Sequence, residues 1–136
     1  MATRSYLPRT NLCSSIYLLL LLLLSCGSER VERQLTPADT LLQEALSKVR
    51  EDYRQLHLPA ALAAARTLPL RQATEVGLRA EAYQYLAMLH YERGLFRDSI
   101  GYYTELAGAL IGKEASPQLQ ARQQVCHAMV RYYDWR

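Results

Sequence analysis

Apolar residues recur every three or four positions over most of the chain beyond residue 36, which predicts a series of amphipathic helices. The first is expected to open at Thr36 and Pro37, a capping residue followed by a proline that suits the first helical position. A short, alanine-rich helix follows from Pro59 to Leu68, and Pro69 ends it. The apolar stripe of the first helix is Leu42, Ala45, Leu46, Val49 and Tyr53.

Two longer stripes flank Gly94, which suits a helix end that needs a positive φ. They predict a third helix from about Ala73 to Arg93 and a fourth from about Phe96 to Ile111. Because the turn between them is short, the two helices should be antiparallel neighbours. A fifth helix is predicted from Pro117 to near the end of the chain. The first stripe is Tyr83, Leu86, Ala87 and His90, and the second is Phe96, Ile100, Tyr103, Leu106 and Leu110.

The order of residues from 80 to 107 resembles the tetratricopeptide repeat (TPR), a helix–turn–helix unit of 34 residues. The resemblance is carried by the aromatic Tyr83, the large–small pair Leu86 and Ala87, the turn glycine Gly94, the aromatic Phe96, and Ser99 in place of the usual alanine. It implies an all-α, TPR-like α-solenoid of antiparallel helix pairs, with about five helices and an incomplete last repeat. Such folds bind other proteins and rarely do chemistry. An ordinary helical bundle is the alternative interpretation.

The spacing of small residues extends the repeat hypothesis to the rest of the chain. Ala61 and Ser99 are 38 residues apart, and Ala87 and Cys126 are 39 apart. Repeats are therefore predicted at about 36–70, 71–115 and 116–136, the last of them partial. On this count the fifth helix lacks a partner, so the chain is expected to be truncated or completed by another subunit. The aromatic cluster Tyr132, Tyr133 and Trp135 should then promote self-association.

The N-terminal segment has the layout of a secretory signal. Arg4 and Arg9 precede a nine-residue apolar run, residues 16–24, which is too short for a bilayer that needs about 20 residues. The sequence Leu-Leu-Ser-Cys ending at Cys26 resembles the lipobox of bacterial lipoproteins. That resemblance implies a signal peptide over residues 1–25, a lipidated Cys26 and a tether over 26–35. A plain signal with a coincidental cysteine, or an uncleaved short anchor, is the alternative.

Charge and candidate chemistry narrow the function classes. The chain has a formal charge of +3, and loss of the two arginines in residues 1–25 leaves +1, so no nucleic-acid partner is expected for this segment. Cys126 would be the single remaining thiol, which leaves no intramolecular disulfide. His57, His90 and His127 match no zinc spacing. We therefore expect no catalytic residues, no metal and no cofactor, and a protein that is not an enzyme.

The resemblance also suggests a binding surface, because the first helices of TPR-like pairs line a groove. The stripe of the third predicted helix opposite its core is Glu81, Gln84, Met88, Tyr91 and Glu92. These residues are predicted to bind an extended or helical peptide with some apolar and basic character; a merely solvated face is the alternative.

The predicted function is an envelope-anchored scaffold or adaptor without enzymatic activity, held by an N-terminal lipid. It would lie on the periplasmic side of the inner or outer membrane, or at the cell surface. The alternative is the N-terminal sensory TPR part of a longer signalling or transcriptional regulator.

Overall fold

The regular structure of the chain is helical wherever the computed structural model describes it, which is over residues 35–94 and 97–135. Five α-helices, α2 to α6, and no strand lie within these residues, so the predicted all-α class is confirmed. The compact helical unit begins at Leu35. The predicted signal peptide, the lipidation site Cys26 and nearly all of the tether lie outside the described residues.

Helices α2 (Pro37–Arg54) and α3 (Leu58–Arg66) form the first hairpin. Thr36 caps α2 as predicted: its hydroxyl accepts a hydrogen bond from the Asp39 backbone N–H, and the Asp39 carboxylate accepts one from the Thr36 N–H. The turn that follows α2 holds Leu56 at a φ of 60°, a left-handed conformation that is uncommon for leucine. The hairpin core is formed by Leu42, Leu46, Val49, Ala61, Leu62 and Ala65, all buried.

The second hairpin joins α4 (Val76–Glu92) to α5 (Arg97–Leu110). Gly94 has a φ of 61°, so the predicted left-handed glycine at this helix end is confirmed. Helix α4 begins three residues later than predicted because the Glu75 side chain accepts a hydrogen bond from the Leu78 N–H and sets the start. Among the described side chains of α5, Ile100, Thr104 and Ala107 are buried, whereas Tyr103, Leu106 and Leu110 of the predicted stripe are half-buried. Phe96, the first residue of that stripe, lies outside the described residues.

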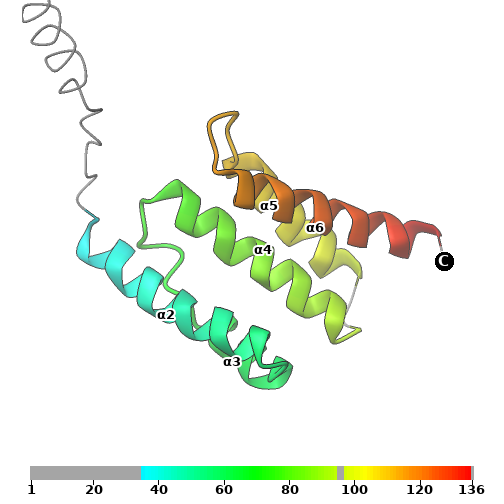
Figure 1. Cartoon of the computed structure of the whole chain (residues 1–136), viewed down its shortest axis with the longest axis horizontal. Coiled ribbons are helices and arrows are strands. Elements are labelled where there is room, and N and C mark those ends of the chain that lie inside the picture. Colours follow the sequence, from blue (N-terminus) through cyan, green and yellow to red (C-terminus); the bar gives the residue numbers. More distant parts are fainter. Residues whose placement is uncertain (1–34, 95–96, 136) are drawn as a thin grey trace, which may run out of the picture. The chain divides into compact units, whose positions relative to one another are not determined.

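Helix α6 (Pro117–Trp135) packs against this second hairpin. Figure 1 shows α2, α4 and α6 side by side in one layer, with α3 and α5 behind them. The arrangement is all-α and resembles a helical repeat. Within residues 35–94 and 97–135, no helix combines the length and the apolar character needed to cross a bilayer.

Helix α4 is the centre of the unit, because it contacts each of the other four helices. Seven consecutive residues, Gln84 to His90, are buried in it. A helix surrounded in this way has no solvent-facing stripe over residues 84–90. The prediction of an amphipathic helix is therefore wrong for this stretch. The unbroken apolar run from Tyr85 to Leu89 was a local sign of burial on all sides.

Candidate functional site

The predicted groove residues on α4 do not form an open stripe. Gln84 and Met88 are only 0% and 6% exposed, because α6 lies against this side of α4. Gln84 and Met88, which the sequence predicted to line a peptide-binding groove, are therefore not accessible to a peptide in this structure. Tyr91 is half-buried and packs edge-on against Tyr133 with ring centroids 5.6 Å apart, whereas Glu92 is exposed.

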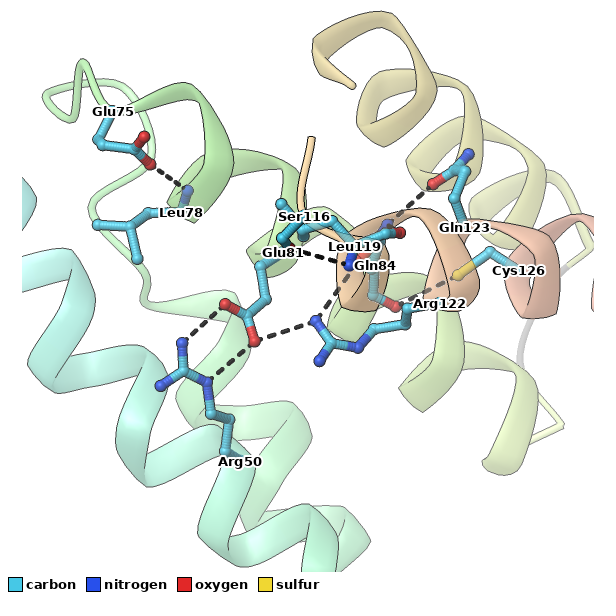
Figure 2. Close-up of polar contacts among 10 residues, drawn as sticks. All are labelled: Arg50, Glu75, Leu78, Glu81, Gln84, Ser116, Leu119, Arg122, Gln123 and Cys126. Carbon is cyan, nitrogen blue, oxygen red and sulfur yellow. Dashed lines mark hydrogen bonds and ion pairs between the residues drawn. The ribbon is translucent and has the colours of Figure 1, made fainter. Parts of the chain in front are cut away.

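Glu81, the remaining predicted groove residue, connects the three helices of the front layer. Arg50 of α2 donates from its Nε and Nη2 to the two Glu81 carboxylate oxygens, at 3.0 and 2.7 Å. Arg122 of α6 pairs with the same carboxylate at 3.0 Å. Figure 2 shows the two guanidinium groups reaching Glu81 from opposite sides. Two positive charges thus share one negative charge, so Glu81 offers no free carboxylate for a basic ligand.

Two tyrosines lie beside this cluster. The Arg122 guanidinium carbon lies 4.9 Å from the centroid of the Tyr85 ring, a cation–π contact. Tyr53 of α2 packs edge-on against Tyr85 at 5.6 Å. Burial, and then the carboxylate of Glu92, raise the pKa of Tyr53, which keeps its hydroxyl protonated. We call Arg50, Tyr53, Glu81 and Arg122 the arginine–tyrosine face; Tyr85, only 8% exposed, is buried against Tyr53 and Arg122 and supports it.

Buried amides hold α6 to the second hairpin. Gln84 Nε2 donates to the Leu119 carbonyl oxygen at 2.9 Å and to Gln123 Oε1 at 3.2 Å. Gln123 Nε2 in turn donates to the Thr104 carbonyl oxygen on α5 at 2.9 Å. The Cys126 thiol donates to the Gln84 backbone oxygen; Figure 2 draws this contact together with those of Gln84 to Leu119 and Gln123. Because buried amides are costly unless hydrogen-bonded, this network fixes how α6 sits on α4 and α5.

Gly108 of α5 makes room for that network. A Cβ atom at this position would lie 3.1 Å from Gln123 Nε2, closer than most real contacts. Nothing lies within 4 Å of the corresponding atom at Gly101, in the same helix. The glycine at 108 is therefore explained by the close approach of the Gln123 amide.

Asp39 ties the start of α2 to the start of α4, and sequence reasoning missed it. Its carboxylate accepts hydrogen bonds from the Thr74 N–H at 2.7 Å, the Glu75 N–H at 2.8 Å and the Thr74 hydroxyl at 3.0 Å. These bonds, led by one from the Thr36 hydroxyl, hold the pKa of Asp39 well below its usual range. Only the local part of this contact, a threonine followed three residues later by an acid, was visible in the sequence.

His90 and Cys126 are two further titratable groups in the interior. His90 is buried beside Tyr103, and neither of its ring nitrogens has a hydrogen-bond partner; burial and nearby Arg66 lower its pKa. Burial raises the pKa of the Cys126 thiol to about 11, so it is protonated and unreactive. Among the described residues, no three His, Cys, Asp or Glu side chains are grouped so that they could hold a metal ion.

Two shallow pockets of about 400 and 390 Å³ lie away from the arginine–tyrosine face. One is beside the connection between α5 and α6 and the other beside that between α3 and α4, where Arg71 and Tyr83 line it. Neither contains any residue of the predicted groove.

Tyr132 and Tyr133, two of the aromatic residues predicted to promote self-association, contact each other and both contact Tyr91 of α4, whereas the side chain of Trp135 lies outside the described part of the structure. Tyr133 is half-buried against Tyr91 and belongs to the packing of α6 on α4. Tyr132 is 44% exposed.

Comparison of the chain with protein-family models, with curated proteins and with solved structures finds no match.

Proposed function

We propose that the chain is an envelope-anchored, TPR-like lipoprotein that acts as a non-enzymatic scaffold or adaptor for another protein. The observation that carries the proposal is the front layer of α2, α4 and α6, three neighbouring helices that present one continuous side of the unit (Figure 1). Stacked helical hairpins use such extended surfaces to bind proteins.

The arginine–tyrosine face is the proposed contact on this layer. Tyrosine and arginine are the residues that most often dominate the binding energy of protein interfaces. Arg50 and Arg122 are 30% and 22% exposed at their side chains, so both can be reached from solvent. Since they outnumber Glu81, the face suits a partner segment that carries an acidic side chain, in place of the basic one first expected.

Lipid anchoring at Cys26 is supported by the short apolar run and the Leu-Leu-Ser-Cys sequence. Several acyl chains on the N-terminal cysteine would give stable membrane attachment, whereas one chain gives only marginal binding. Cells supplied with a clickable fatty acid should label the wild-type chain and not Cys26→Ser. Equal labelling of the two would remove the lipoprotein part of the proposal.

Protein binding is tested separately by photo-crosslinking in intact cells. A benzophenone amino acid is placed at Glu92, which is exposed on α4 near Tyr53, and in a control chain at Tyr102, which is 58% exposed on α5. The proposal predicts a discrete crosslinked partner from position 92 and not from position 102. Its yield should fall with Arg50→Glu. The same crosslinks from both positions, or none from position 92, would count against the arginine–tyrosine face.

A further inference from the structure

One side of α4 carries most of the buried polar atoms that lack a hydrogen-bond partner. Arg79, Tyr83, Leu86 and His90 follow one another at spacings of four, three and four residues, so they lie in one line along the helix. We call these four residues the back stripe. Among the described residues, four buried side-chain nitrogen or oxygen atoms have no partner, and three of them are on this stripe: Arg79 Nε and both ring nitrogens of His90. Because a buried polar atom without a partner is costly, a ligand that supplied hydrogen bonds here would be stabilising.

The back stripe lies between α3 and α5, the two helices behind α4 (Figure 1). On the α5 side, the rings of Tyr83 and His90 both contact Tyr103, with centroids 6.3 and 5.3 Å from it. On the α3 side, Tyr83 lines the pocket of about 390 Å³, whose other lining residues are 68–72 in the connection after α3. Helices α3 and α5 both pack on α4 but not on each other within the described residues. The pocket therefore gives a small ligand access to the stripe at Tyr83.

Three arginines around the back stripe have no acidic partner. Arg66, Arg71 and Arg79 lie at the end of α3, in the pocket wall and on the stripe, and none forms an ion pair with a carboxylate of the described residues. Burial, and then the charge of nearby Arg66, lower the pKa of His90. Glu75 precedes Arg79 by one turn, but its carboxylate accepts a hydrogen bond from a backbone N–H at the start of α4. The positive charge beside the stripe is therefore unbalanced, whereas both arginines of the arginine–tyrosine face are paired.

We propose that the back stripe binds a small ligand in which an oxyanion, either a carboxylate or a phosphate, is attached to an apolar body. Arg71 and Arg79 hold the oxyanion, because guanidinium groups donate paired N–H bonds to such groups. This places an acceptor beside Arg79 Nε, which has none within the described chain. The apolar body lies on the ring of Tyr83, against Leu68 and Leu70 of the same pocket. At about 390 Å³ the pocket is near the lower limit of ligand sites, roughly 300–1,000 Å³, so it suits a single aromatic or aliphatic acid.

The test follows the Nε–H signals of the arginines in ¹⁵N NMR spectra of the full chain in detergent micelles. Three probes are added in turn: phenylacetate, phenyl phosphate and the neutral phenylacetamide. We expect the Arg79 signal to shift with at least one of the two anions, whereas the signal of Arg50, whose Nε is bonded to Glu81, should not move. Phenylacetamide should bind at least about ten-fold more weakly, because it lacks the charge that strengthens hydrogen bonds to arginine. The two anions distinguish a carboxylate ligand from a phosphate ligand.

Two single variants separate binding from folding, while Arg79→Gln assigns the Arg79 signal by removing it. Arg71→Gln removes one charge from an exposed position in the pocket wall and should weaken binding of the anion about ten-fold, measured at the Arg79 signal. Arg93→Gln, at an exposed position at the other end of α4, is the matched control and should leave the dissociation constant unchanged. Both variants should keep the helical circular dichroism of the wild-type chain.

Four results would overturn the proposal: no shift of the Arg79 signal with either anion, an equal affinity for phenylacetamide, a shift at Arg50 in place of Arg79, or equal affinities of Arg71→Gln and Arg93→Gln. None of these outcomes depends on lipid anchoring or on the partner of the arginine–tyrosine face.

Discussion

Replacing Gln84 by leucine tests whether the α4–α6 contact depends on buried amides. From the sequence alone, this residue belonged to an open stripe and Gln84→Leu would cost little. In the structure Gln84 is fully buried and donates to Leu119 and Gln123. A leucine of similar size would fill the space without making either hydrogen bond.

The expected cost follows from what is left unpaired. The Leu119 carbonyl lies in a regular helix and keeps its intrahelical bond, so the main loss falls on Gln123 Oε1. A buried acceptor left without a partner costs about 1–3 kcal/mol. We expect the free energy of unfolding to fall by about 2 kcal/mol. For a domain of this size the melting temperature should fall by about 8–16 °C.

Thermal and urea unfolding, followed by circular dichroism at the helical band, would measure this loss. Gln124→Leu is the matched control, since Gln124 is exposed on α6 and its replacement should change stability by less than about 0.5 kcal/mol. The double variant Gln84→Leu/Gln123→Leu removes donor and acceptor together and should cost less than the sum of the single variants. Equal stability of Gln84→Leu and Gln124→Leu would refute the assignment of Gln84 to the core.

Three further predictions concern single positions. Gly101→Ala, in open space within α5, should stabilise the unit by up to about 1 kcal/mol, whereas Gly108→Ala must displace the Gln123 amide and should stabilise it less or destabilise it. Equal stabilisation of the two variants in unfolding curves would contradict the close contact between Gly108 and Gln123. Because the fold lowers the pKa of Asp39, its carboxylate contributes to the free energy of unfolding above the ordinary pKa of 3.8, and this contribution is lost as the pH falls below that value. Asp39→Asn should therefore lower the free energy of unfolding at pH 7 and flatten its decline toward acid, as measured by urea unfolding from pH 6 to 2. The pKa of His90 is also lowered, which means that the fold favours the neutral imidazole, so the free energy of unfolding should fall as the pH drops below the ordinary histidine pKa of 6.5. His90→Phe should remove this pH dependence between pH 7.5 and 5.5, whereas the control His57→Phe, at an exposed position, should retain it.

Local signals predicted the parts of this fold that depend on a few neighbouring residues. The Thr36 cap and the left-handed Gly94 need only the chain next to them, and both were assigned correctly. The choice of buried face on α4 could not be made in this way. Gln84 is polar and was placed outside, yet its partner Gln123 lies 39 residues away in the sequence.

The same limit applies to the candidate site. Glu81 was singled out, but its two arginine partners come from helices on either side, and Arg50 is 31 residues away. No local spacing identifies such a partner. The charge balance of the arginine–tyrosine face therefore follows only from the packed arrangement of α2, α4 and α6.

Helices α2, α4 and α6 form one layer, and we expect α6 to be held in it as firmly as the helices it joins. Hydrogen exchange of the backbone amides, followed by mass spectrometry, tests it most directly. We expect residues 120–130 of α6 to be protected to the same degree as residues 80–90 of α4, and Gln84→Leu to lower the protection of α6 more than that of α2. Rapid exchange throughout α6 in the wild-type chain, with α4 still protected, would show that α6 is not part of the layer.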